Sequence, residues 1–142
     1  MTVEVERTFE LAAPREDVWE FISDPERRAA PISVVKDYEE TGDRTAIWHV
    51  QIPVPMVDRT IAIETRDTDR REPEYVRFVG RSKVLNVVGE HELEAVEGGT
   101  RLTNRFTVDG KLPGVERFFK KNLDAELDNL EAAIQRDLGA RA

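Results

Sequence analysis

The sequence predicts an α+β fold in which a curved, seven-stranded antiparallel sheet wraps around one long C-terminal helix. One or two short helices are expected after the first strand. Apolar and polar residues alternate over residues 2–11 and again over about residues 32–108, as in strands with one buried face. Residues 113–139 instead carry an apolar stripe at helical spacing, the only long apolar surface that could cover such a sheet.

The first strand and the short helix after it are marked by their residue pattern. One face of the strand is formed by Val3, Val5, Arg7, Phe9 and Leu11. In the segment PREDVWEFISDPE, Pro14 suits the first turn of a helix, and the acidic residues after it suit the positive end of the helix dipole. We expect Pro25 to end this helix.

Six further strands and the long helix complete the expected fold. Turn signals separate the strands at residues 41–43, 53–55, 70–73, 81–83 and 98–99. The helix is predicted from apolar residues that recur every three or four positions, namely Phe119, Leu123, Leu127, Leu130, Ile134 and Leu138. It should end near Gly139.

The last hairpin is predicted around two glycines in the stretch VEGGTRLTNRF. A two-residue loop at Gly98 and Gly99 places Leu93 opposite Asn104 and His91 opposite Phe106. His91 and Asn104 are then diagonal neighbours on one face, roughly 7 to 8 Å apart at the backbone.

Length and composition limit the class of protein. A chain of 142 residues fits one domain, residues 1–142, of ordinary size. No apolar run approaches the roughly 20 residues that span a bilayer, and no signal-peptide core is present, so we expect a cytoplasmic protein without stable membrane insertion. The net charge of −8 disfavours nucleic acid as a partner.

The residue types that hold metals and cofactors are scarce. The chain has no cysteine, and alternation places its two histidines, His49 and His91, on opposite faces. It has neither an HExxH spacing nor a glycine-rich phosphate loop, so we predict no metal site and no cofactor. Arg outnumbers Lys and acidic residues are abundant, a composition that resembles proteins of salt-loving archaea. An ordinary acidic bacterial protein is the alternative.

The order of elements and three segments carry a resemblance to a known superfamily. The segments are VERTFELAAPREDVWEFISDPE, GEHELEAVEGGTRLTNRFTVDG and LDAELDNLEAAI. They are similar to the first strand and helix, the last hairpin and the gripping helix of the START-like (SRPBCC) superfamily, which has the helix-grip fold. This superfamily includes polyketide cyclases or dehydrases and lipid-transfer proteins. Within it the chain most resembles the small cyclase-like members and the small members related to carbon monoxide dehydrogenase. Because it ends at Ala142 without an apolar tail, we do not expect membrane anchoring.

The resemblance implies a cavity between the curved sheet and the long helix. The inward parity of the strands supplies six candidate ligand-binding residues, which are Arg7, Trp48, Phe78, His91, Asn104 and Phe106. The three polar residues would orient the polar end of a ligand, and the three aromatic residues would hold its body. Alternatively, neighbouring protein groups satisfy the buried Asn and His, and Arg7 pairs with a carboxylate such as Glu126.

Three functions are compatible with this pattern. The leading one is binding or transport of a small hydrophobic molecule, such as a lipid, a quinone or a polyketide-like compound. The second is a polyketide cyclase/dehydrase-like enzyme that uses His91, the only inward histidine, as a catalytic proton shuttle. The third is a protein-interaction module whose cavity is filled by its own side chains.

One loop is unusually apolar. The segment IPVPMVD, residues 52–58, joins two strands, and its prolines stiffen it. It could form a rim over the cavity mouth or contact a protein partner. Alternatively, its apolar side chains fold back onto the long helix.

Overall fold

The computed structural model describes residues 2–54 and 59–141, which form seven strands and three helices. In chain order the elements are β1 (Thr2–Leu11), α1 (Arg15–Ile22), α2 (Pro25–Ala29), β2 (Val35–Gly42), β3 (Thr45–Val50), β4 (Ile61–Arg71), β5 (Tyr75–Arg81), β6 (Leu85–Val96), β7 (Gly99–Gly110) and α3 (Val115–Arg141). This order confirms the predicted helix-grip fold, with two short helices after the first strand.

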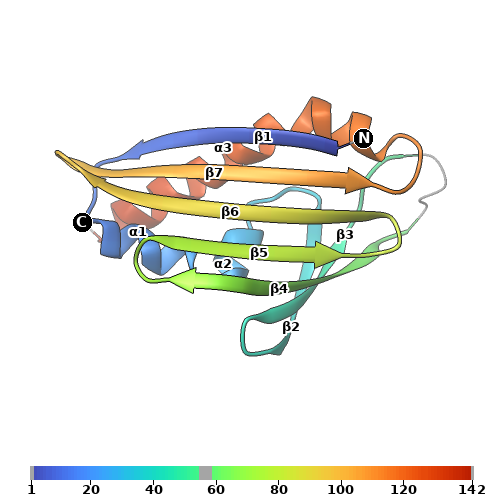
Figure 1. Cartoon of the computed structure of the whole chain (residues 1–142), viewed down its shortest axis with the longest axis horizontal. Coiled ribbons are helices and arrows are strands. Elements are labelled where there is room, and N and C mark those ends of the chain that lie inside the picture. Colours follow the sequence, from blue (N-terminus) through green and yellow to red (C-terminus); the bar gives the residue numbers. More distant parts are fainter. Residues whose placement is uncertain (1, 55–58, 142) are drawn as a thin grey trace.

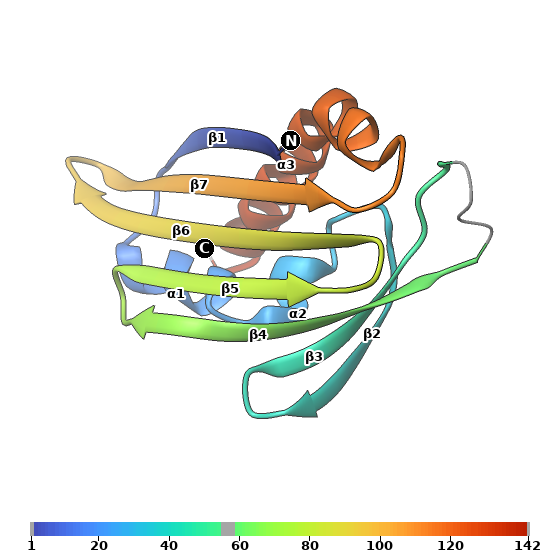
Figure 2. The ribbon, with the colours of Figure 1, turned by 45° about the vertical axis from the view of Figure 1, so that its right-hand side comes forward.

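The strands form one antiparallel sheet in the order β1-β7-β6-β5-β4-β3-β2. All three helices lie on the same face of the sheet, with α3 running behind β1 and β7 (Figure 1). In the turned view of Figure 2, β2 and β3 bend away from the direction of the other strands. The sheet therefore curves, and α3 lies in its hollow.

The junction between the short helices differs from the prediction in one detail. Helix α1 ends at Ile22, and Pro25 begins α2 rather than only ending the helix before it. Asp24 caps α2, because its Oδ1 accepts a hydrogen bond of 3.0 Å from the backbone N–H of Glu26. Proline suits this position, since the first N–H groups of a helix have no partner inside the helix.

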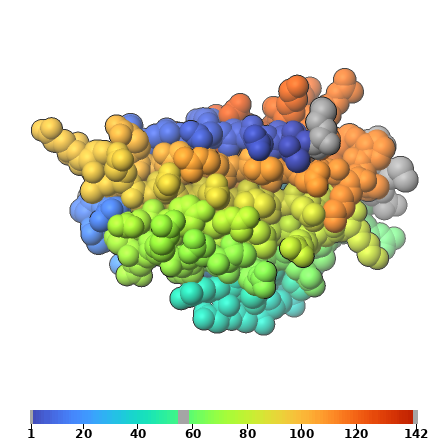
Figure 3. Space-filling model, in the orientation of Figure 1, coloured from blue at the N-terminus to red at the C-terminus, as the bar shows by residue number. Residues whose placement is uncertain are grey.

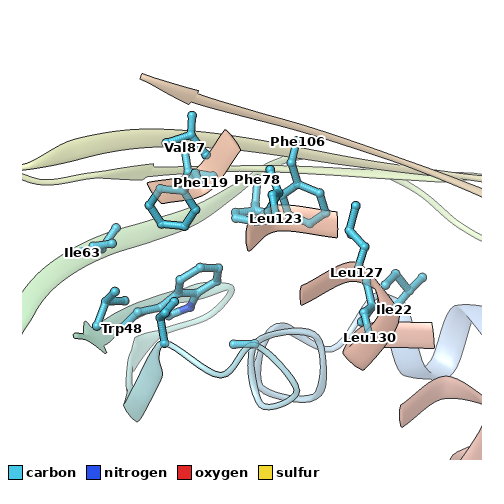
Figure 4. Close-up of a cluster of buried hydrophobic side chains, with 14 of the residues drawn as sticks. Ile22, Trp48, Ile63, Phe78, Val87, Phe106, Phe119, Leu123, Leu127 and Leu130 are labelled. Carbon is cyan, nitrogen blue, oxygen red and sulfur yellow. The ribbon is translucent and has the colours of Figure 1, made fainter. Parts of the chain in front are cut away.

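The inner face of the sheet and the apolar stripe of α3 form the core. Phe119, Leu123 and Leu127 of α3 face Phe78 and Phe106 of the sheet (Figure 4). Each of these side chains is buried, as the alternation of strand residues and the helical spacing predict. Burial of a large apolar side chain stabilises a fold by roughly 1.5–3 kcal/mol, so this contact holds the helix in the hollow.

The outer face of the sheet carries charged side chains in ordered rows. Figure 3 shows this face, with the β6–β7 turn projecting at one end. Each row joins β1, β7 and β6 through a central arginine, and the two rows are Glu6–Arg105–Glu92 and Glu10–Arg101–Glu94. Their N···O distances lie between 2.9 and 3.2 Å.

The predicted register of the last hairpin is wrong by two residues. The two-residue turn is Glu97-Gly98, and Val96 pairs with Gly99. Gly98 has a φ of 84°, which favours glycine, whereas a Cβ on Gly99 would overlap the carbonyl oxygen of Leu11. His91 therefore lies directly opposite Asn104 instead of diagonal to it.

We predict that Gly89→Ala destabilises the fold. A Cβ at Gly89 would overlap the ring of Phe78, which lies on the glycine and is fully buried. Overpacking of this kind costs about 1–3 kcal/mol in the free energy of unfolding, measurable by urea denaturation. The matched control is Gly139→Ala in α3, where a Cβ meets nothing within 4 Å and helix propensity rises. Equal stability of the two variants would contradict the assigned packing of Phe78.

Candidate functional site

A narrow apolar slot lies between the sheet and α3. Its walls come from β2 to β7, from α3 and from the segment between α2 and β2. The lining residues are Arg28, Ile32, Val34, Val35, Trp48, Val50, Ile63, Phe78, Leu85, Val87, Phe106, Val108, Phe119, Leu123, Glu126 and Leu127. The open volume is about 50 Å³, far below the roughly 300–1,000 Å³ of common ligand sites. The slot is thus a narrow gap in the core.

The three aromatic candidates lie together at this slot. Trp48 of β3 and Phe78 of β5 have ring centroids 5.5 Å apart, and Phe106 of β7 lies 6.2 Å from Phe78. All three line the slot (Figure 4). Their grouping follows from the inward parity of three different strands, which the sequence pattern predicts.

His91 and Asn104 form a buried pair beside the slot. His91 Nδ1 and Asn104 Oδ1 are 2.7 Å apart, and Asn104 Nδ2 donates a hydrogen bond of 3.1 Å to the carbonyl oxygen of Arg7. Because the amide oxygen can only accept, His91 Nδ1 carries the proton. The amide of Asn104 thus has partners on both sides, and it joins β1, β7 and β6.

The environment of His91 keeps its imidazole neutral. Burial is the main cause that lowers the pKa of His91 from 6.5 to about 3, and the positive charge of Arg28 adds to the effect. The hydrogen bond to Asn104 opposes it. With a pKa this low, His91 holds no second proton to donate near neutral pH and is a weak base.

Arg7 lies apart from the other candidates. Its guanidinium pairs with two carboxylates of α3, at 2.7 Å from Asp128 and 3.6 Å from Asp124, and its side chain is 30 % exposed. Only its backbone carbonyl meets Asn104. A salt bridge with α3 was the alternative for Arg7, but the partner is not Glu126.

Glu126 instead turns into the slot and fixes the segment between α2 and β2. One carboxylate oxygen accepts the backbone N–H of Ser33 at 2.9 Å, and the other accepts the Ser33 hydroxyl at 2.8 Å. Asn129 Nδ2 donates a further hydrogen bond of 3.1 Å. Glu126 is 4 % exposed, so these donors compensate for the loss of water around its charge.

Arg28 is a second buried charge at the slot. Its guanidinium donates to Asp67 Oδ1 at 2.5 Å and to the carbonyl oxygen of Ile22 at 3.1 Å. It also lies over the ring of Phe78, 4.9 Å from the centroid. Asp67 is shared, because its other oxygen accepts from Arg70 at 2.8 Å. The result is a buried cluster of two cations and one anion.

A bulge in β4 makes this cluster possible. Asp67 pairs with Phe78 and Asp69 pairs with Arg77, so Thr68 is an extra residue in the strand. Asp67 and Arg70 are three positions apart and would otherwise point to opposite faces of the sheet. The extra residue brings both to the inner face.

The sequence analysis missed Arg28, Asp67 and Ser33. The arginines of PERRA and the acidic residues of ETRDTDRR resemble solvated surface charges, and no pattern marks the bulge. Glu126 did leave a signal, since it lies on the apolar stripe of the helix, three residues after Leu123. Of the loop 52–58, residues 55–58 lie outside the described residues, whereas Ile52 and Val54 are buried in the core.

Two further searches concern the described part of the chain. Over residues 2–54 and 59–141, no group of three or more His, Cys, Asp or Glu side chains could hold a metal ion. No helix in these ranges is sufficiently long and apolar to cross a bilayer.

The comparisons with known proteins agree with this architecture. The model of a family described as "Polyketide cyclase / dehydrase and lipid transport" matches residues 2–135. No curated protein matches the sequence.

Three similar solved structures share the fold. A conserved protein from Geobacillus kaustophilus has a TM-score of 0.77 at 20% identity, over 97% of this chain and 96% of its own. A START superfamily protein from Mycobacterium smegmatis has a TM-score of 0.77 at 17% identity, over 98% and 99%. The Zhui aromatase/cyclase from Streptomyces sp. R1128 has a TM-score of 0.71 at 17% identity, over 97% and 96%.

The buried His91 predicts a pH-dependent stability. Its pKa is about 3 in the folded chain, against an ordinary value of 6.5. Between these values the unfolded chain binds a proton that the folded chain does not, so stability falls as the pH is lowered. We expect His91 to account for a loss of about 2 kcal/mol between about pH 7.5 and pH 5, measured by urea denaturation. His91→Gln should lose this component and His49→Gln should keep it; the reverse result would refute the assignment.

Proposed function

Because the chain belongs to the polyketide cyclase/dehydrase and lipid transport family, we propose that it binds a small, largely hydrophobic molecule in the slot between the sheet and α3. The observation that carries the proposal is the apolar slot itself, with aromatic rings on the sheet side and Phe119 and Leu123 on the helix side. Burial of apolar ligand surface there would contribute about 25 cal/mol per Å². A lipid, a quinone or a polyketide-like molecule has such a surface.

The narrowness of the slot requires that a ligand of this size widens it. One wall consists of Ile32, Val34 and Val35, which flank Ser33. Movement of this wall away from α3 would break the two hydrogen bonds between Ser33 and Glu126. The other walls are strands held in the sheet ladder, so the segment between α2 and β2 is the part that we expect to move.

A second candidate function is a protein-interaction module with a filled interior. The small open volume of about 50 Å³ favours it. A cyclase/dehydrase-like activity that relies on His91 has less support, because the low pKa of His91 leaves it without a proton to transfer near neutral pH.

We expect ligand binding to raise the melting temperature. The purified protein is incubated with a panel of lipids, quinones and aromatic polyketides, and thermal shift is compared with mass spectrometry of extracted ligands. A compound found by both methods supports the proposal. If both methods stay blank across the panel, the interaction module becomes the better assignment.

Filling the slot should abolish binding without unfolding the chain. Val87 lines the slot from β6, and we predict that Val87→Phe weakens binding of any panel ligand by about tenfold or more, since the new ring occupies the ligand's space. The matched control is Val79→Phe in β5, where the side chain is on the opposite face of the sheet. Equal affinity of the two variants would place the ligand elsewhere.

A further inference from the structure

We propose that the slot selects ligands that carry an acceptor oxygen, a carboxylate or a carbonyl, which receives hydrogen bonds from Arg28 and Trp48. The proposal presupposes that the slot binds the hydrophobic molecule proposed above, and it adds the chemistry of that molecule's polar end. It is carried by the hydrogen-bonding state of the polar side chains in the slot wall.

Two slot-lining side chains have a buried donor without an acceptor. Neither Arg28 Nε nor Trp48 Nε1 has a hydrogen-bond partner within residues 2–54 and 59–141. Arg28 is 4 % exposed and Trp48 is 8 % exposed, so water does not surround them as it would at the surface. An unsatisfied buried donor costs about 1–3 kcal/mol, and an acceptor that enters the slot would recover part of that cost.

The acceptors of the slot wall are already used. Glu126 is the lining residue with side-chain acceptors, and both of its oxygens receive hydrogen bonds from Ser33. Apart from Arg28 and Trp48, the other lining side chains are aliphatic or aromatic hydrocarbons. The described side chains in the wall thus offer unpaired donors and no unpaired carboxylate oxygen, so a donor group on a ligand would find no such partner.

The charge of the Arg28 cluster acts in the same direction. Arg28 and Arg70 share the single carboxylate of Asp67, which leaves one positive charge in excess within the cluster. The side chains of Arg28 and Asp67 are 3 % and 2 % exposed, so water screens this charge weakly. An anionic oxygen would be attracted to the cluster, and an ammonium group would be repelled by it.

Four compounds of similar size and shape separate these contributions. Ethylbenzene tests the apolar slot alone, acetophenone adds a neutral acceptor, benzoate adds a charged acceptor and benzylammonium adds a charged donor. We expect acetophenone or benzoate to bind about tenfold more tightly than ethylbenzene, and benzylammonium to bind most weakly. Affinities are measured by calorimetry at neutral pH on the full chain.

The indole N–H resonances give a direct readout. The chain has two tryptophans, so a ¹H–¹⁵N spectrum contains two indole signals, and Trp48→Phe assigns them. We expect acetophenone to move the Trp48 signal downfield, whereas ethylbenzene should not. Trp48→Phe should reduce the preference for acetophenone over ethylbenzene by about threefold or more, since it removes one donor and keeps an aromatic ring. The matched control Trp19→Phe changes a buried tryptophan of α1 that does not line the slot and should keep the preference.

Each outcome separates this inference from the proposed function. Binding of ethylbenzene as tight as that of acetophenone and benzoate would overturn the acceptor preference and leave the hydrophobic slot intact. Tight binding of benzylammonium would also overturn it. If none of the four compounds binds, the proposed function fails as well. The ranking in the unaltered protein needs no variant, so poor folding of Trp48→Phe would not protect the inference.

Discussion

The packing of one amphipathic helix against one curved sheet is the constraint on which the rest of this structure depends. The inner face of the sheet is apolar over most of its area, and α3 carries the only long apolar stripe in the described part of the chain that can cover it. The helix packs most closely on β1 and β7, near one edge of the sheet. The curvature that brings β3 and β4 toward the helix leaves the contact there less complete, and the slot lies in that region.

Two polar groups inside this apolar interior have different physical roles. The His91–Asn104 pair is satisfied on the side of β7 and β1, so it fixes three strands relative to one another. The cluster of Arg28, Asp67 and Arg70 is charged, and burying charge costs free energy unless partners compensate for it. Its geometry satisfies the carboxylate fully but leaves part of Arg28 unpaired. A fold with stability as its sole requirement could fill this position with an apolar side chain.

The sequence predicts the faces of the strands better than it predicts their partners. The hairpin register was wrong by two residues, yet every inward residue stayed inward, because side chains alternate with a period of two. Arg28 and Asp67 escaped prediction for a different reason. A bulge changes the parity of β4, and its position depends on contacts with α2 that local sequence does not encode. The width of the slot is equally inaccessible, since it depends on how side chains from distant elements interlock.

The charged rows on the outer face have a consequence for how the chain assembles. Strands β1 and β6 present glutamates to the arginines of β7, in the order acid, base, acid. Exchanging β1 for another acidic strand would preserve the pairing, but placing β1 beside β6 would set carboxylates against carboxylates. The N-terminal strand has to find a neighbour roughly a hundred residues away, and the rows mark β7 as its correct docking edge. Individually weak surface pairs can thereby favour one strand topology over its competitors.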